Sequence, residues 1–477
     1  MSTITTRIPH YPMLIDGRSV PAEGTPADVL NPATEEVVGT APDITDAQYE
    51  QALESAGRAF STWRDTPLAE RRKVLVSMAR LIEENLDELT ALHTAEQGKP
   101  LQAARLEWAG SARWLATMAE FEYHADETRE EGGRTVRVRH TPYGVVVGIV
   151  PWNFPVALAV WKVGPALLTG NTLVLKPSPY TPLTMLRFGE LVRDVVPAGV
   201  LNIVSGTSGL GNRLTSDPRV AKISLTGSTA TGKAVMATAS QRLARVTLEL
   251  GGNDAAIVLP DVDLDTTVEK VFWAAFINSA QICIGAKRVY VHDSIYDAFA
   301  ERFAKIAETA VVGNGAEEGV KLGPVQNRRQ YERVRELIEA TEQAGHRFLV
   351  KGDIPEGRGY FIHPTVVDNP PDDSRIVREE PFGPIVPLLR YTSVDEVVAR
   401  ANDSEYGLAG SVWSSDPEAA AEVAARLDTG VVWVNAAQVL APGIPFSGHK
   451  ESGIGHENGV EGVQEYTNTQ VVSMPRN

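Results

Sequence analysis

Hydrophobic residues recur at three- and four-residue steps through the early part of the chain, a spacing typical of amphipathic helices. The clearest run comprises Tyr49, Ala52, Leu53, Ala56, Phe60 and Trp63. We therefore predict helices across residues 45–126. From residue 134 the pattern becomes alternating, because "RTVRVRH" places apolar and polar residues in turn and "GVVVGIV" follows after "TPY". These stretches predict a hairpin that leads into a buried strand.

Short apolar segments next alternate with helical segments, as in successive βαβ units. Strands are expected at 171–177, 200–206, 221–227 and 245–250. They predict a parallel, doubly wound sheet that binds ligands at the carboxyl ends of its strands. A second alternation follows Gly251, with strands expected at 255–259, 288–292 and 431–435 and helices at 263–278, 294–311, 329–344 and 416–427. Segment 463–475 is also strand-like, and is either a terminal tail or a strand that pairs with another subunit.

Composition and charge narrow the class of protein. A chain of 477 residues is too long for one typical domain, and 43% hydrophobic residues suffice for large cores. The excess of 61 acidic over 45 basic residues disfavours nucleic acid and anionic membranes as partners. A single cysteine excludes an intrachain disulfide framework and suits a reducing compartment. With no secretory signal pattern and no apolar run of ~20 residues, we predict a soluble, cytoplasmic protein.

The single cysteine, Cys283, stands between two isoleucines in "NSAQICIGAKRVYV". It is either a small core hydrophobe or a nucleophile. Three polar residues support the second interpretation: Asn153 in "PWNFP", Glu249 in "LELGG" and Glu380 in "EEPFGP". Alone, they are explained as a turn amide, a strand-end acid and a surface acid. Together with a thiol they supply the amide donor and the base that thioester chemistry requires.

Two glycine-containing turns follow expected strands. "VSGTSGLG" includes Gly206, and "LTGSTATG" includes Gly227 and Ser228. Such turns let backbone N–H groups and a helix N-terminus approach phosphate oxygens, although neither matches G-x-G-x-x-G and either can be an ordinary turn. Lys176 ends a buried strand in "LKPSP", where its ammonium group can meet a ribose or phosphate or remain solvated.

Seven motifs occur in order: "PWNFP", "KPS", "TGS", "ELGG", "FINSAQIC", "EEPFGP" and "PFSGHKESGIGHENG". Together they closely resemble the non-acylating, hydrolytic branch of the aldehyde dehydrogenase superfamily, from "NPATEEVVGTAP" to the last strand. The resemblance implies an α/β fold with a Rossmann-like cofactor domain (1–123 and 143–251), an α/β catalytic domain (252–450) and a small β oligomerisation element (124–142 and 451–477). It also implies a homodimer or homotetramer.

The resemblance implies a role for each motif residue. Cys283 attacks the aldehyde, Asn153 and the Cys283 N–H hold the oxyanion, and Glu249 activates the water that hydrolyses the thioester. Lys162 and Glu457 match positions linked to proton relay. The matched cofactor-binding positions are Trp152, Lys176, Ser178, Gly206, Gly227, Ser228, Glu380 and Phe382. NAD is the expected cofactor, and NADP stays open because Pro179 stands where many NAD-preferring relatives have glutamate. No metal is expected.

The positions matched to the substrate tunnel are apolar throughout. They are Phe154, Leu158, Trp161, Ile277, Ile282, Ile284, Leu440 and Phe446. We therefore expect an aromatic or medium-chain aliphatic aldehyde. The alternatives are a semialdehyde dehydrogenase, a CoA-acylating enzyme, against which Glu249 argues, and a non-catalytic protein on the same fold. The chain departs from the common pattern at Leu225, Ala280, Ser447 and His456, none of which removes a catalytic group.

Overall fold

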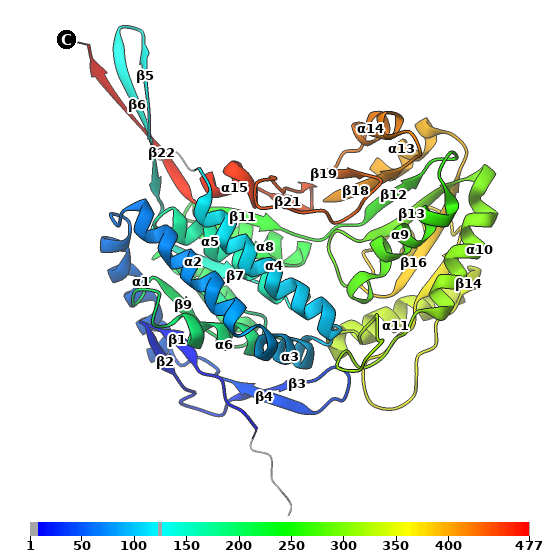
Figure 1. Ribbon diagram of the computed structural model, residues 1–477, viewed down its shortest axis with the longest axis horizontal. Helices are drawn as coiled ribbons and strands as arrows, with labels where there is room; N and C mark the ends of the chain where they lie inside the picture. Colours follow the sequence, from blue (N-terminus) through cyan, green and yellow to red (C-terminus); the bar gives the residue numbers. More distant parts are fainter. Residues whose placement is uncertain (1–7, 123–125, 477) are drawn as a thin grey trace, which may run out of the picture.

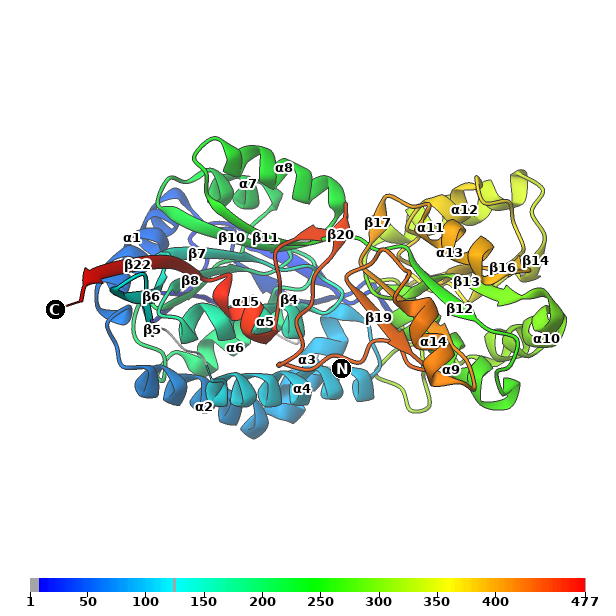
Figure 2. The same ribbon diagram turned by 90° about the horizontal axis from the view of Figure 1, so that it is seen from above.

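The computed structural model describes residues 8–122 and 126–476, so the predicted domain boundary between residues 123 and 124 lies outside the described residues. The chain forms two α/β lobes that lie side by side, and a narrow β-sheet projects from one of them (Figures 1 and 2). Each lobe is built around its own sheet, with strand order β2-β1-β9-β8-β7-β10-β11-β21 in the first and β14-β15-β16-β13-β12-β18-β19 in the second.

The first lobe has five neighbouring parallel strands at its centre, as the alternation of strands and helices predicted. These are β7 (Val145–Ile149), β8 (Thr172–Lys176), β9 (Leu201–Ile203), β10 (Val220–Thr226) and β11 (Arg245–Glu249). The edges are antiparallel and comprise β1 (Met13–Ile15), β2 (Arg18–Val20) and β21 (Gly453–Ile454). A separate pair consists of β3 (Ala27–Leu30) and β4 (Val37–Ala41). The helices are α1 (Asp46–Trp63), α2 (Leu68–Glu84), α3 (Leu86–Gln97), α4 (Leu101–Glu120), α5 (Pro155–Leu168), α6 (Leu183–Val192), α7 (Ser208–Ser216), α8 (Thr229–Ser240) and α15 (Gly459–Gln464).

The second lobe contains three expected strands and several that the sequence pattern missed. Its strands are β12 (Asp254–Val258), β13 (Ala286–His292), β14 (Phe348–Val350), β15 (Thr365–Asp368), β16 (Ile385–Tyr391), β18 (Ala409–Trp413) and β19 (Val431–Val434). Its helices are α9 (Leu264–Phe276), η1 (Ile277–Ala280), α10 (Asp293–Thr309), α11 (Arg328–Gln343), α12 (Arg375–Arg378), α13 (Val394–Asn402) and α14 (Pro417–Ala424). β16 was missed because Pro387 interrupts it, and a proline within an apolar run argues against an interior strand.

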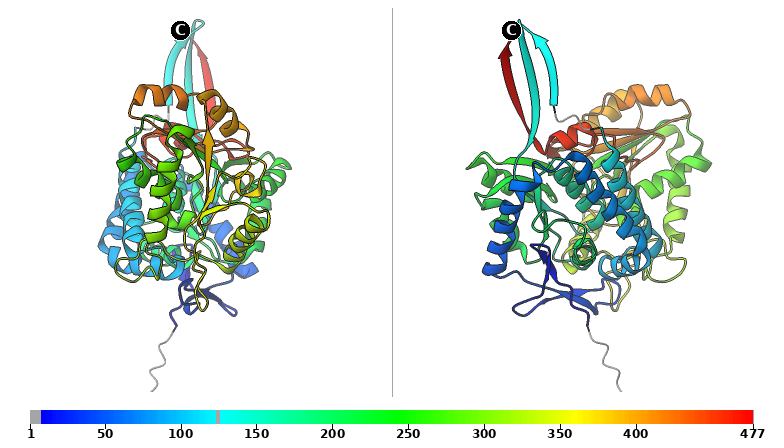
Figure 3. Two further views of the ribbon diagram at one scale, coloured as in Figure 1. Left: turned by 90° about the vertical axis from the view of Figure 1, so that its right-hand side faces the viewer. Right: turned by 60° about the vertical axis from the view of Figure 1, so that its left-hand side comes forward.

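The projecting sheet corrects the predicted hairpin (Figure 3). β6 (Arg134–Pro142) pairs with β5 (Asp126–Glu131) and β22 (Thr467–Pro475), whereas β7 lies in the first-lobe sheet. The hairpin turn is therefore at Gly132 and Gly133, whose φ angles of +59° and +74° suit a two-residue hairpin turn. The sequence pattern missed β5 because its exposed residues, "DETREE", show no apolar alternation. A last antiparallel pair, β17 (Tyr406–Gly407) with β20 (His449–Lys450), lies near β21.

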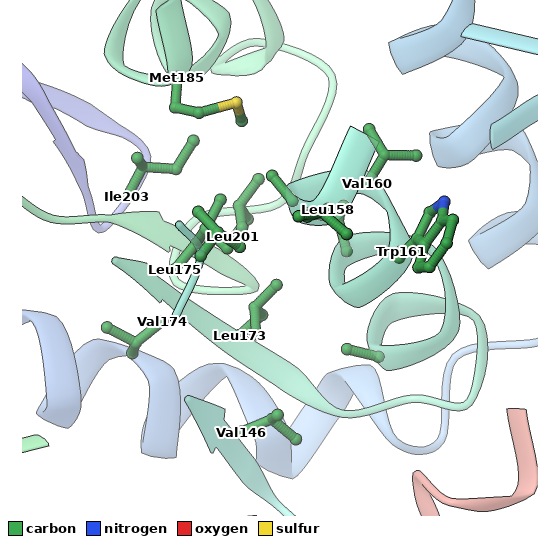
Figure 4. Close-up of a cluster of buried hydrophobic side chains, with 14 of the residues drawn as sticks. Val146, Leu158, Val160, Trp161, Leu173, Val174, Leu175, Met185, Leu201 and Ile203 are labelled. Carbon is green, nitrogen blue, oxygen red and sulfur yellow. The ribbon is translucent and has the colours of Figure 1, made fainter. Parts of the chain in front are cut away.

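The core of the first lobe lies between its sheet and α5. Figure 4 shows Leu158 of α5 beside Leu175 and Leu201, with Trp161 farther along the helix and away from these residues. All four side chains are buried. Burying one leucine stabilises the fold by about 1.5–3 kcal/mol, so this contact holds α5 firmly on the sheet. The site described next begins at the N-terminus of that helix.

Candidate active site

Cys283 follows a turn with an uncommon backbone. Three residues of this turn have positive φ: Asn278 (+53°), Ser279 (+55°) and Ala280 (+59°). Hydrogen bonds hold the turn, because the Ser279 hydroxyl donates to the Gly323 carbonyl at 2.7 Å and the Gln281 amide donates to the Asn278 carbonyl at 2.9 Å. Non-glycine residues in this region cost of order 1–3 kcal/mol each, and such strain gathers at functional sites. A glycine at position 280 would lower that cost.

The Cys283 thiol and the Glu249 carboxyl group line the same cavity, and each shifts the pKa of the other. Glu249 ends β11, and its side chain is buried. Burial raises the pKa of Glu249 to about 8, while the thiol and Lys162 act to lower it. Burial and the nearby Glu249 raise the pKa of the Cys283 thiol well above its usual range. A carboxyl group with a pKa near neutral pH is suited to accept a proton in a reaction.

Asn153 lies at the start of α5, where two other side chains fix the backbone. Its Nδ2 donates to the Gln281 carbonyl at 3.1 Å, and its own carbonyl accepts a hydrogen bond from Lys99 Nζ at 3.0 Å. Lys99 is ion-paired with Glu107, whose Oε1 accepts the N–H groups of Val156 and Ala157, the next residues of α5. An amide carries two N–H groups, so one Nδ2 donor stays available to a ligand.

The sequence analysis missed Lys99 and Glu107. The pair is buried, with Lys99 2% and Glu107 9% exposed. A signal for Glu107 does exist, because it lies between Ala104 and Ser111 on the buried face of α4. A carboxylate on an apolar helix face needs a partner, but the sequence does not show which cation supplies it.

Lys162 and Glu457 come together from opposite ends of the chain. Lys162 Nζ donates to Glu457 Oε1 at 2.8 Å and to Thr226 Oγ1 at 3.0 Å, and Ser224 donates to the same Glu457 oxygen at 3.2 Å. Lys162 and Glu457 are 1% and 2% exposed. Both charges act on the pKa of Glu249, Lys162 lowering it and Glu457 raising it, so the pair lies within electrostatic reach of that carboxyl group.

A cavity of about 320 Å³ is lined by Cys283 and Glu249 together with other polar and apolar side chains, and we call it the polar cavity. Its lining includes Trp152, Asn153, Gly227, Ser228, Glu380 and Phe382, all singled out from the sequence. The rings of Trp152 and Phe382 meet edge to face at 5.4 Å. Ser228 caps α8 by accepting the Thr231 N–H at 3.3 Å, which leaves the other N–H groups of the first turn directed at a ligand.

Lys176, Ser178 and Gly206 lie outside this lining, just beyond the carboxyl ends of β8 and β9. Lys176 is 4% exposed, and within the described part of the chain its Nζ donates to the Pro177 carbonyl at 3.2 Å. Burial lowers the pKa of Lys176 to about 8, while Asp43 acts to raise it. A buried ammonium group with donors to spare fits a sugar hydroxyl, so these residues suit a dinucleotide. The sequence analysis missed Asp43.

A second, mainly apolar cavity of about 450 Å³ borders the loop that carries Asn153, since the next residue, Phe154, lines it. Trp161, Ile277 and Leu440 also line it, as expected, together with the unforeseen Ala103, Leu106, Gly110, Trp114, Ala157, Val160 and Trp273. Phe446 packs against the Trp161 ring at 5.8 Å. Leu158, Ile282 and Ile284 lie outside this lining, buried in the core. Polar residues complete the wall: Lys99, Glu107, Ser111, Asn278, Lys321 and Gln438.

Two features are absent from the described residues, 8–122 and 126–476. No cluster of three or more histidine, cysteine, aspartate or glutamate side chains is placed to hold a metal ion there. In the same ranges no helix combines the length and the apolar character needed to cross a membrane.

Two α/β lobes meet at a cavity that is lined by a partly buried thiol and a buried carboxyl group. These features define a class of enzyme that uses a cysteine and a dinucleotide. The sequence profile of the aldehyde dehydrogenase family matches residues 20–472, and the chain belongs to this family. Phenylacetaldehyde dehydrogenase of Pseudomonas fluorescens is 38% identical over 97% of this chain and 95% of its own. Glutarate-semialdehyde dehydrogenase of Pseudomonas putida is 39% identical over 95% of both chains.

A solved NAD+ complex of an aldehyde dehydrogenase from Bacillus cereus has a TM-score of 0.95 and is 35% identical, with 98% of this chain and 97% of that chain covered. The resemblance and the α/β fold class predicted from the sequence are thereby confirmed.

Proposed function

We propose that the protein oxidises an apolar aldehyde, aromatic or medium-chain aliphatic, to its carboxylic acid with NAD+. The observation that carries this proposal is that Cys283, Glu249 and Asn153 line one cavity, while Phe154, the residue after Asn153, lines the apolar cavity. The apolar cavity would hold the substrate side chain and the polar cavity the nicotinamide, so that aldehyde and hydride acceptor approach the thiol from different sides.

In the proposed mechanism the Cys283 sulfur attacks the aldehyde carbon after its proton passes to a base such as Glu249. The Asn153 amide and the Cys283 N–H stabilise the resulting oxyanion. NAD+ held in the polar cavity would supply the hydride acceptor, and loss of the hydride from the oxyanion would leave an acyl group on the Cys283 sulfur. Glu249 then takes a proton from water, and the hydroxide releases the carboxylic acid and the thiol. Lys162 and Glu457, joined at 2.8 Å, pass the proton onward.

The substrate class is tested with an aldehyde panel followed by NADH absorbance. Benzaldehyde and hexanal should show a kcat/KM at least about tenfold above that of succinic semialdehyde, because an unpaired carboxylate in an apolar cavity costs several kcal/mol. A preference for the semialdehyde would contradict the apolar assignment.

One observation favours a semialdehyde as the second candidate. Lys321 lines the apolar cavity and is exposed, so its ammonium group is available to a distal carboxylate. Lys321→Met separates the two candidates. If the cavity takes apolar aldehydes, this variant keeps the benzaldehyde kcat/KM, whereas a semialdehyde enzyme would lose its preferred activity.

The dinucleotide preference is tested at Pro179. This residue is exposed and lies three positions after Lys176, where no carboxylate repels a 2′-phosphate. We therefore expect weak discrimination against NADP+, and Pro179→Glu should raise the KM for NADP+ at least about fivefold more than the KM for NAD+. Pro355→Glu, the same change at an exposed position of the second lobe, is the matched control and should leave the ratio unchanged. An unchanged ratio in Pro179→Glu would place the adenosine ribose elsewhere.

A homodimer or homotetramer is also proposed. The sheet of β5, β6 and β22 projects from the first lobe, and both of its outer strands have an open edge (Figures 1 and 3). β22 exposes Val471, Val472 and Met474, by 60%, 38% and 38%. Open strand edges with exposed apolar side chains are suited to pairing with another chain. The rest of the C-terminal segment packs on the first lobe through β21 and α15.

A further inference from the structure

Lys287 is a buried cation between the nucleophile and the polar cavity, and the mechanism above gives it no role. It belongs to β13, four positions after Cys283, and its side chain is 3% exposed. Its Nζ donates to the Cys283 carbonyl and lies 3.2 Å from Glu380 Oε1. One ammonium group therefore contacts both the backbone of the nucleophile and Glu380, a carboxylate matched to cofactor binding.

The two oxygens of Glu380 have different surroundings. Oε1 accepts the Gly252 N–H at 3.1 Å and faces Lys287. Oε2 packs against Gly251, where an added Cβ would lie only 2.5 Å from it, and it accepts no hydrogen bond from residues 8–122 or 126–476. Because Glu380 lines the polar cavity, Oε2 is the oxygen free to accept a ligand hydroxyl. Lys287 and Gly252 thus hold Glu380 by its other oxygen, Oε1.

The charges around the thiol give Lys287 a second effect. Three charged side chains act on Cys283: the carboxylates of Glu249 and Glu380, and the ammonium group of Lys287. The two carboxylates raise the pKa of the thiol, and Lys287 lowers it. Glu249 comes from β11, Glu380 from the loop before β16 and Lys287 from β13, so the opposing charges converge from three elements.

We propose that Lys287 is a positioning residue that couples the nucleophile to the cofactor carboxylate. It fixes the Cys283 backbone and Glu380 in one arrangement and favours the thiolate over the thiol. This inference rests on the roles proposed above for Cys283 and Glu380, and its tests need no aldehyde and no turnover. A failed aldehyde panel would therefore overturn the proposed function while these measurements still decide the role of Lys287.

The first test is the pH profile of Cys283 alkylation by iodoacetamide in the cofactor-free protein. The chain has one cysteine, so the alkylation rate reports Cys283 alone. An opposite charge at short range shifts a pKa by roughly 1–3 units. Lys287→Met should therefore move the profile up by at least about one pH unit and slow alkylation at pH 7 about tenfold. Lys287→Arg should restore most of the rate, and Lys305→Met, an exposed lysine on α10, should leave it unchanged.

The second test is NAD+ affinity, measured by isothermal titration calorimetry. Lys287→Met should weaken binding several-fold in the wild-type background and have no further effect in Glu380→Gln, because it acts through that carboxylate. Should Lys287→Met fail to fold, Lys287→Gln, which keeps a hydrogen-bond donor without the charge, takes its place in both tests. A folded variant with wild-type alkylation and wild-type NAD+ affinity would overturn the inference. A shifted alkylation profile with unchanged NAD+ affinity would overturn the proposed coupling of Cys283 to Glu380.

Discussion

Cys283→Ala should abolish aldehyde oxidation while the fold and NAD+ binding survive. Loss of the nucleophile removes the thioester route completely, and knocking out a nucleophile elsewhere lowers kcat by about 10⁶-fold. The structural cost is small, since Cys283 is partly buried and deleting one sulfur there destabilises a large domain by about 1–2 kcal/mol. The measurements are steady-state NADH production, the melting temperature and NAD+ affinity.

A matched control for this variant is Ile284→Val, which trims the neighbouring buried side chain and leaves the thiol in place. It should keep most of the activity. Cys283→Ala with activity near that of Ile284→Val would show that the lone cysteine is a core residue.

Glu249→Gln should separate hydride transfer from hydrolysis. The amide cannot activate water, so the enzyme should release about one NADH per site and then stall, with steady-state turnover lowered by about 10²–10⁴-fold. Because Glu249 also contacts the thiol, the burst itself should be slower than in the wild type. Stopped-flow absorbance measures the burst and the steady state in one trace. Glu451→Gln, the same change on a partly exposed acid paired with Lys233, should turn over normally.

The pH dependence of the wild type follows from the same carboxyl group. The base works only when ionised, and burial raises the pKa of Glu249 to about 8. Where hydrolysis limits the rate, kcat should rise about tenfold per pH unit below pH 8 and level off above it. Glu249→Gln should lose this rise. A flat wild-type profile between pH 6 and 8 would assign the base to another group.

Local patterns predicted much of the fold but not the parts that depend on distant pairing. The parallel strands β8 and β10 are largely apolar and lie between helices, which a sequence shows directly. β5 is a charged strand whose partner is the exposed β6, so its pattern contains no burial signal. β16 contains Pro387, and whether a strand tolerates a proline depends on its position in the sheet, which the sequence does not show.

The site likewise combines residues in local motifs with residues whose partners lie far away in the sequence. Asn153, Glu249 and Cys283 stand in motifs, and the structure places them around one cavity. Lys99, Glu107 and Lys287 belong to no motif that the sequence analysis used, and their importance comes from partners elsewhere in the fold. The residues of the substrate tunnel were harder still to predict, because Leu158 and Trp161 lie on one helix but face different surroundings. Periodicity finds a buried helix, but it does not tell which buried side chain borders a cavity.

The central claim is that an acyl group forms on Cys283 and that Glu249 directs its hydrolysis. The most direct test is mass spectrometry of Glu249→Gln after mixing with NAD+ and benzaldehyde. The account predicts a benzoyl adduct, one per chain, on the peptide that carries Cys283, together with one equivalent of NADH. NADH release without any adduct on that peptide, or normal steady-state turnover of the variant, would contradict it.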